Sequence, residues 1–335
     1  MNSIGSPLMW SLFAAFVLVA LLVDFFAMSK QGAHRVSIKE AAVWSLIWVG
    51  VSFVFLGWLW WYLDANSTRE IANAKALEFL TGYLVEKALA VDNIFVFLMV
   101  FTYFAVPPEF QKRVLMIGIL GALVLRAGMI LIGAWLIQQF DWILYIFGAF
   151  LVFTGVKMWW AAGQEPDLES NPALKWARSH LKIAPDYNGE RFTTTINGVR
   201  YFTPLFIVIA LIGIVDIIFA VDSIPAIFAI TTDPFIVLTS NVFAILGLRA
   251  MYFLLAGMHE RFHLLSYGLA IVLAFIGTKM LLLDVYKIPV VWSLGFTVVV
   301  LAVTMVLSLM IPAKGKGGGA YPFGAKKRSA ESGTH

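Results

Sequence analysis

The sequence predicts an all-α, polytopic membrane protein of about nine transmembrane helices with a 3+3 inverted-topology repeat. Of its 335 residues 61% are hydrophobic and only 13% are charged, whereas soluble domains are about half apolar and about a quarter charged. The apolar residues lie in long blocks, and about 20 residues are enough to cross the hydrocarbon core. Because backbone groups in lipid must be hydrogen-bonded internally, blocks without strand alternation must form helices. A recurring acidic motif in two blocks predicts the repeat.

Polar segments separate the expected spans. The first block lacks a preceding basic region and is longer than the usual apolar region of a signal peptide, so we expect it to be retained. The third and sixth spans are longer than a crossing requires and should be tilted, kinked or broken. The nine expected spans are Leu8–Met28, Ala41–Leu63, Leu77–Ala105, Val114–Ile137, Trp142–Trp160, Tyr201–Ile230, Phe235–Met258, Leu264–Leu283 and Pro289–Ile311.

The spans and loops divide the chain into six parts. The predicted parts are two N-terminal helices (1–76), a first repeat of three helices (77–160), a cytoplasmic loop (161–200), a second repeat of three helices (201–288), a C-terminal helix (289–312) and a disordered basic cytoplasmic tail (313–335). Within the loop, Asn171–Lys182 is expected to form a short amphipathic helix. An Asn-Gly pair between apolar residues predicts a small hairpin at Phe192–Tyr201. A connecting loop docked on the membrane face is favoured over a catalytic domain.

The distribution of basic residues predicts the orientation, because cytoplasmic loops carry an excess of Lys and Arg. One set of alternate loops, together with the tail, has 16 Lys and Arg residues, and the opposite set has only 3. The N-terminus should therefore face outward and the C-terminus should lie in the cytoplasm. The formal charge of +4 reflects this topology, and nucleic acid is not an expected partner.

The internal repeat is the most informative feature. Leu84–Ile94 aligns with Ile214–Ile224, and each segment has two acidic residues six positions apart. Further on, Leu125-Arg126-Ala127 recurs as Leu248-Arg249-Ala250, and Thr154–Met158 recurs as Ile276–Met280. Each unit contains three spans, so the two units should enter the membrane from opposite sides. Secondary transporters often have this plan, with a site near the midplane where the repeats meet.

Four carboxylates within the repeat would cost on the order of 10 kcal/mol if each faced lipid, so they must face one another, a cation or a wet cavity. Glu86 and Asn93 fall within about 20° of one helix face, and Asp92 lies about 120° away. Local unwinding would therefore help the carboxylates to converge. In the second unit Pro225 cannot donate to the carbonyl of Val221, which could then act as a further ligand.

The oxygen chemistry of these segments favours a hard cation such as Mg²⁺, Ca²⁺ or Mn²⁺. No resident cofactor is expected, so the metal ion would be the substrate. Arg126 and Arg249 are expected to be counter-charges or gates, and a purely structural alternative pairs them with the carboxylates in intramembrane salt bridges. The candidate ligands are Glu86, Asp92, Asn93, Asp216, Asp222 and Ser223.

At Glu86–Phe97 and Asp216–Thr231 the chain resembles the TerC family, and in particular its Alx-like branch among the LysE-type exporters. The resemblance extends from the first span to about residue 305. It implies a manganese exporter of the inner membrane, with the six candidate ligands at the family's acidic motif. The family takes its name from tellurium resistance. In one departure, Gly213 stands where this family is expected to have Glu, three residues before Asp216, which puts one ligand in question.

Other functions stay open at this stage. A non-transporting membrane scaffold for metal delivery or tellurite resistance would depend on the loop rather than on the carboxylates. A third class is an exporter of an organic solute, as elsewhere among LysE-type exporters. Four acids in one site argue against an anionic substrate but not against a cationic amino acid. Older descriptions make the Alx branch a redox modulator, but the chain has no cysteine, which excludes thiol chemistry within it. No nucleophile–base arrangement stands out, so an enzyme is not expected.

Overall fold

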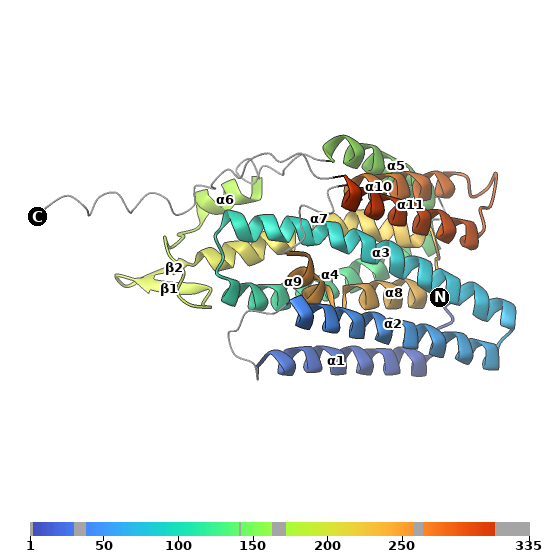
Figure 1. Cartoon of the computed structure of the whole chain (residues 1–335), viewed down its shortest axis with the longest axis horizontal. Coiled ribbons are helices and arrows are strands. Elements are labelled where there is room, and N and C mark those ends of the chain that lie inside the picture. Colours follow the sequence, from blue (N-terminus) through green and yellow to red (C-terminus); the bar gives the residue numbers. More distant parts are fainter. Residues whose placement is uncertain (1–2, 30–37, 141, 163–171, 257–263, 312–335) are drawn as a thin grey trace, which may run out of the picture.

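The computed structural model describes the chain except for residues 1–2, 30–37, 141, 163–171, 257–263 and 312–335. The predicted C-terminal tail therefore lies outside the described residues. The described part is a bundle of long helices with a two-stranded hairpin beyond one end (Figure 1). Its elements are α1 (Pro7–Ser29), α2 (Ile38–Asn66), α3 (Arg69–Tyr103), α4 (Pro108–Gln139), α5 (Ile143–Ala161), α6 (Pro172–His180), β1 (Thr193–Ile196), β2 (Val199–Phe202), α7 (Pro204–Phe228), α8 (Pro234–Ile245), α9 (Leu248–Ala256), α10 (Leu265–Leu281) and α11 (Val290–Met310).

Within the described residues the all-α membrane class is confirmed. By length and composition, 6 spans are long and apolar enough to cross a membrane: α2, α4, α5, α7, α8 with α9, and α11. Two shorter apolar stretches, Pro7–Val23 and Leu265–Leu281, lie in α1 and α10. Helix α3 is in neither group, and the apolar half of its sequence contains Glu86, Lys87 and Asp92. The number of nine spans stays a prediction.

The helices form a bundle with a buried centre. Helices α5, α10 and α11 lie along one side and α1 and α2 along the other, with α3, α4, α7, α8 and α9 between them (Figure 1). The most enclosed is α8, in which every residue except Leu238 is buried. By contrast α11 buries only Ser293, Thr297 and Ser308, as expected for a helix whose other faces meet lipid.

Helices α5 and α10 pack closely through small residues. A Cβ atom added to Gly148 would lie 3.0 Å from the carbonyl oxygen of Gly277, and one added to Gly155 would lie 2.8 Å from that of Ala270. Residue numbers rise along α5 as they fall along α10, so the two helices are antiparallel. Small residues allow this close backbone approach, which stabilises helix pairs in lipid by van der Waals packing.

The expected seventh span is broken into α8 and α9 at Gly247. Its φ of +83° suits glycine, since a Cβ atom is strained in this region. A Cβ atom there would also meet the Trp48 side chain of α2 at 2.7 Å. Both the backbone conformation and the packing against α2 therefore require glycine at this position.

Aromatic packing attaches α1 and α2 to the central helices. The Phe243 ring of α8 lies 5.2 Å from Phe16, 4.5 Å from Phe55 and 6.0 Å from Phe79, measured between ring centroids. Buried aromatic pairs at these separations stabilise an interface beyond the area they cover. This contact holds α8 by one side against α1, α2 and α3.

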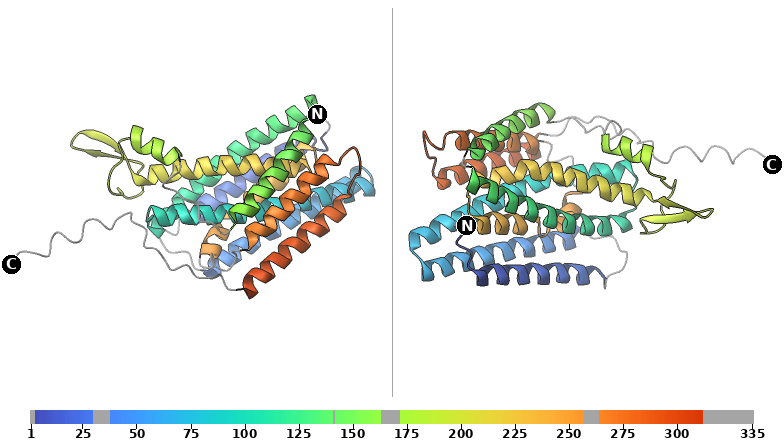
Figure 2. Two further views of the ribbon diagram at one scale, coloured as in Figure 1. Left: turned by 90° about the horizontal axis from the view of Figure 1, so that it is seen from above. Right: turned by 180° about the vertical axis from the view of Figure 1, so that it is seen from behind.

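The expected hairpin and short helix are both present. Strands β1 and β2 pair antiparallel, with Thr193 opposite Phe202 and Ile196 opposite Val199. Asn197 and Gly198 have φ of 52° and 77°, the positive values that a tight two-residue hairpin turn needs. The hairpin and α6 lie beyond one end of the bundle, and the N-terminus lies towards the other (Figures 1 and 2).

Candidate functional site: a buried carboxylate–arginine cluster

Glu86, Arg126 and Asp216 come from three helices and meet in the interior. Glu86 on α3 is 0% exposed, Arg126 on α4 is 2% exposed and Asp216 on α7 is 6% exposed. One guanidinium nitrogen of Arg126, Nη1, donates to Glu86 Oε1, while Nη2 donates to Asp216 Oδ1 at 3.3 Å. Arg126 thus joins a carboxylate from the first acidic motif to one from the second. We call these three residues the Arg126 cluster.

Each carboxylate of the Arg126 cluster keeps one free oxygen. Glu86 Oε2 and Asp216 Oδ2 have no hydrogen-bond partner among the described residues, and neither does Arg126 Nε. Two carboxylates face one guanidinium, so the cluster has an excess of negative charge when both are ionised. Buried charges and polar atoms are costly unless they are paired, and these two oxygens are therefore suited to accept a cation or a donor.

Two other candidate ligands, Ser223 and Asn93, lie seven residues after Asp216 and Glu86 in the sequence. Ser223 is 1% exposed, and its Oγ accepts from Arg126 Nη1 at 3.3 Å. Asn93 is also buried, at 4% exposed, on the same face of α3 as Glu86 and about two turns further along the helix. Asp92 belongs to α3, but its side chain lies outside the described part of the structure.

Asp222 has different neighbours. It is half-buried, and its Oδ1 accepts from Thr154 of α5 at 3.3 Å. The charge of Lys157, one turn further along α5, also acts on it. Among the described side chains no three His, Asp or Glu are grouped so that they could hold a metal ion. In this structure the described carboxylates therefore do not form a single site.

The expected unwinding of the acidic segments is wrong. Helix α3 continues through Glu86 and Asn93, and α7 continues through Pro225 to Phe228. Pro225 stands near the end of α7, so the helix loses a bond there without breaking. Glu86 and Asp216 converge because they come from two different helices that face Arg126. The break lies instead at Gly247, between α8 and α9, and Arg249 stands in the first turn of α9.

Lys87 stabilises this break. Its ammonium donates to the carbonyl of Ala244 at 3.0 Å and to that of Leu246 at 3.4 Å. The last carbonyls of a helix lack partners within the helix, and a cation there also interacts favourably with the helix dipole. The contact of Lys87 with the end of α8 was not predicted from the sequence. The sequence features that could have indicated it are a lysine inside one span, Lys87, and a glycine inside another, Gly247.

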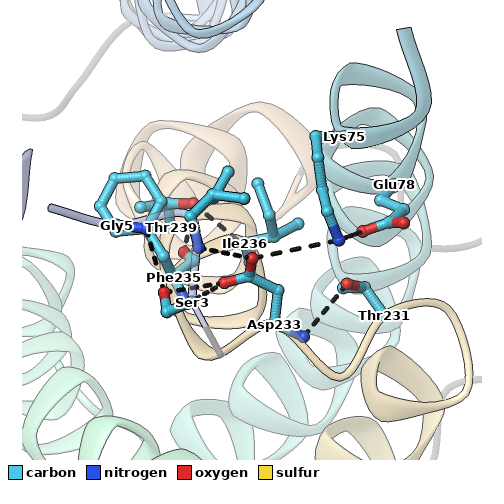
Figure 3. A network of polar contacts seen from close by, with 10 residues as sticks. Ser3, Gly5, Lys75, Glu78, Thr231, Asp233, Phe235, Ile236 and Thr239 are labelled. Atoms are coloured by element: carbon cyan, nitrogen blue, oxygen red, sulfur yellow. Dashed lines mark hydrogen bonds and ion pairs between the residues drawn. The ribbon is translucent and has the colours of Figure 1, made fainter. Parts of the chain in front are cut away.

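A second polar network, which sequence reasoning missed, surrounds Asp233 at the start of α8 (Figure 3). Asp233 Oδ1 accepts from Phe235 N and from Ser3 Oγ, both at 3.0 Å, and its Oδ2 accepts from Ile4 N at 3.0 Å. Asp233 therefore caps α8 and also binds the N-terminal segment. The Asp-Pro pair before an apolar run indicates the cap, but nothing local indicates the contact with Ser3.

Charged residues of α3 and α10 extend this network. Lys75 Nζ lies 2.8 Å from Glu78 Oε2 and 4.0 Å from Asp233 Oδ2, as Figure 3 shows. The charge of Glu78 also acts on Lys279 of α10, which is 7% exposed. Lys279 is thus buried next to an acid, whereas its counterpart in the first repeat, Lys157, is exposed.

Comparison with known proteins gives a family. The profile described as "Integral membrane protein TerC family" matches residues 71–316 of the chain. A protein of Escherichia coli (strain K12) is 55% identical over 311 residues, which cover 93% of this chain and 97% of that protein. One of Salmonella typhi is 54% identical over the same length and shares. Both are named "Putative membrane-bound redox modulator Alx".

More distant relatives match over a similar length. A Myxococcus xanthus protein, "Uncharacterized membrane protein STKORF319", is 45% identical over 308 residues, covering 92% of this chain and 94% of that protein. No solved structure matches the chain.

Proposed function

Because the chain belongs to the TerC family of integral membrane proteins, we propose that it exports a divalent cation, manganese first of all, through a site at the Arg126 cluster. The observation that supports this most is the burial of Glu86 and Asp216 at one guanidinium, with a free oxygen on each. Placing four carboxylates in membrane spans is energetically unfavourable, and binding of a transported cation would explain why they are there.

Arg126 would act as an internal substitute for the cation. In the state seen here its guanidinium neutralises the two carboxylates. An entering divalent cation would compete for the same oxygens, so binding would require Arg126 to move away. Exchange between the tethered cation and the transported one would then link binding to a change in helix packing. A buried ion pair is weak evidence for stability, and a switch is among its best-attested uses.

The inverted repeat is part of the proposal. Residues 77–160 and 201–288 would form two units of opposite orientation, and Arg126 with Asp216 would join one unit to the other. The antiparallel packing of α5 and α10 supports this, because they are the third helices of the two units. Gly155 and Gly277, which correspond in the sequence repeat, both lie in that interface.

We place the protein in the inner membrane with its N-terminus outside. The 16 to 3 asymmetry of Lys and Arg supports this orientation. Helix α6 and the hairpin would then lie in the cytoplasm, at the end of the bundle opposite the N-terminal segment (Figure 2). The choice of manganese depends on the family resemblance, because oxygen ligands also suit magnesium and calcium.

A second candidate follows the names of the relatives, "Putative membrane-bound redox modulator Alx". The chain itself has no cysteine, so a redox effect would reach other proteins indirectly, for example through metal supply. A scaffold without transport would act through the loop that carries α6 and the hairpin. Deleting that loop, rather than neutralising Glu86 or Asp216, would then abolish the effect.

The deciding experiment measures manganese flux into proteoliposomes, with and without a pH gradient. Wild type is compared with Glu86→Gln and Asp216→Asn, and Asp92→Asn and Asp222→Asn extend the series to the other two motif acids. Glu190→Gln is the matched control, since Glu190 pairs with Arg113 at 2.8 Å outside the cluster. Saturable flux that both cluster variants lose and the control keeps supports the carrier. Equal flux in all variants, or none in folded wild type, contradicts it.

A further inference from the structure

Asn241 is a buried polar residue whose side chain has no described partner. It lies on α8 and is 0% exposed, and neither its Oδ1 nor its Nδ2 has a hydrogen-bond partner among the described residues. Burying an amide without hydrogen bonds is unfavourable, because the bonds to water that it loses are not replaced. Such a residue requires a reason other than stability.

The neighbouring polar residues of α8 are satisfied within the helix. Thr239 Oγ1 donates to the carbonyl of Phe235 at 2.7 Å, and Ser240 Oγ donates to that of Val237 at 3.2 Å. The amide of Asn241 makes no such bond. It is therefore available to a partner on another helix or to a ligand.

The packing of α8 against α3 sets the depth of Asn241. A Cβ atom on Gly82 would lie 2.9 Å from Ser240 Oγ, and Lys87 bonds to Ala244 and Leu246. The two helices are thus parallel, and Asn241 is level with Tyr83. At 1.5 Å of rise per residue, Asn241 lies about 4.5 Å along the axis from Glu86, towards the end at which Asp233 caps α8.

Helix periodicity gives the direction of the Asn241 side chain. Phe235 and Phe243, which contact aromatic residues of α1 and α2, lie about 120° and 160° around the helix from Asn241. Asn241 therefore faces away from α1 and α2. The other main neighbours of α8 are α3 and α4. Ser240, which meets Gly82 of α3, lies about 100° around the helix from Asn241, so Asn241 faces α4, the helix of Arg126.

From this position we infer that Asn241 is a further cation-binding residue, whose amide oxygen contacts the ion on its path to or from Glu86 and Asp216. The inference rests on the proposed transport function. With Arg126 displaced, one divalent cation and the two carboxylates are neutral together. In a buried site a neutral oxygen then completes the coordination without adding charge. Nδ2 is meanwhile a donor for a free carboxylate oxygen.

The test compares Asn241→Leu and Asn241→Asp with wild type, using full-length protein in proteoliposomes with Mn²⁺ or Mg²⁺. Thr239→Val is the matched control, because it removes a satisfied hydroxyl from the same buried helix. A second readout is the thermal midpoint in detergent with and without Mn²⁺. Replacing an unpartnered amide by an apolar group of similar size is neutral or stabilising for the apo protein.

We expect Asn241→Leu to keep or raise the apo midpoint while weakening the apparent affinity for Mn²⁺ at least tenfold. Asn241→Asp should retain binding but change the Mn²⁺ to Mg²⁺ ratio, and Thr239→Val should leave both affinities unchanged. If wild type transports and Asn241→Leu transports equally well, the inference is wrong while the carrier stands. Loss of flux in Asn241→Leu together with a lowered apo midpoint makes Asn241 structural and also overturns it. No wild-type flux would overturn the transport proposal, and this inference with it.

Discussion

Arg126→Met removes the guanidinium of the cluster while keeping a side chain of similar length. In the structure Nη2 lies 3.3 Å from Asp216 Oδ1, a separation at which opposite unit charges attract by about 5 kcal/mol at an effective dielectric constant of 20. Desolvation offsets part of this attraction. Removing one partner of a buried pair nevertheless costs roughly 3–5 kcal/mol, because the other charges remain buried without compensation.

A divalent cation should restore much of the stability lost in Arg126→Met. A ligand that binds only the folded state adds about 2.7 kcal/mol at one hundred times its dissociation constant. The same cation should stabilise wild type less, because there it must displace Arg126 from Glu86 and Asp216. The stability of the variant therefore depends on a bound divalent cation, which takes the place of the Arg126 guanidinium.

Thermal unfolding in detergent, followed by the fluorescence of the 12 tryptophans, measures both effects in EDTA and in Mn²⁺. The control is a triple variant that adds Glu86→Gln and Asp216→Asn, which should lose both the instability and the rescue. The reasoning is refuted if Arg126→Met is as stable as wild type in EDTA. It is refuted equally if Mn²⁺ raises the midpoint of the triple variant as much as that of Arg126→Met.

Four further predictions concern other parts of the molecule. A Cβ atom at Gly213 would meet nothing within 4 Å, so Gly213→Glu should fold and tighten Mn²⁺ binding in a titration. Gly213→Ala should only stabilise the helix, by about 1 kcal/mol, and equal affinity in the two variants would contradict a missing ligand. Asp233→Ala should lower the free energy of unfolding by about 1 kcal/mol, because α8 loses its cap, and should speed hydrogen exchange at the Ile4 amide. Asp233→Asn should keep the cap. Unchanged exchange at Ile4 in Asp233→Ala would count against the contact between Asp233 and Ile4. Gly247→Ala should destabilise by more than about 1 kcal/mol in chemical unfolding, because its φ is positive, and Trp48→Ala should relieve only part of this; a neutral Gly247→Ala would disprove the strain. Burial raises the pKa of Tyr187 from 10.0 to about 12, so the stability that its neutral phenol contributes is complete below pH 10 and is lost as the pH rises through 12. Tyr187→Phe should not lose stability over this range. Parallel curves of unfolding free energy against pH for the two proteins would refute the prediction.

Much of the fold could be predicted because its causes are local. A block of about 20 apolar residues must become a helix in lipid whatever its neighbours are, and α2, α5 and α11 fall within a few residues of the expected spans. The hairpin followed from Asn197 and Gly198, which adopt positive φ readily. Glu86 and Asp216 were recognised because a carboxylate in a span is costly wherever it lies.

Other features depend on which helices are neighbours. Arg126 was expected to be a counter-charge or a gate, but only the packing of α4 between α3 and α7 decides that it bonds to Glu86 and Asp216 together. Gly247 resembles the other glycines of the spans in sequence, and its role follows from the contact with Trp48 and the bonds from Lys87 to the end of α8.

The sequence by itself determined the membrane class, the acidic residues and the hairpin, because the cost of placing a charge or a backbone group in lipid is a property of each segment alone. The tertiary structure decided the partners of Arg126, the break at Gly247, the contact of Asp233 with the N-terminal segment and the lack of a partner for Asn241 among the described residues. These depend on distances of a few ångströms between segments far apart in the chain, and hydrogen bonds and ion pairs lose their strength beyond such distances.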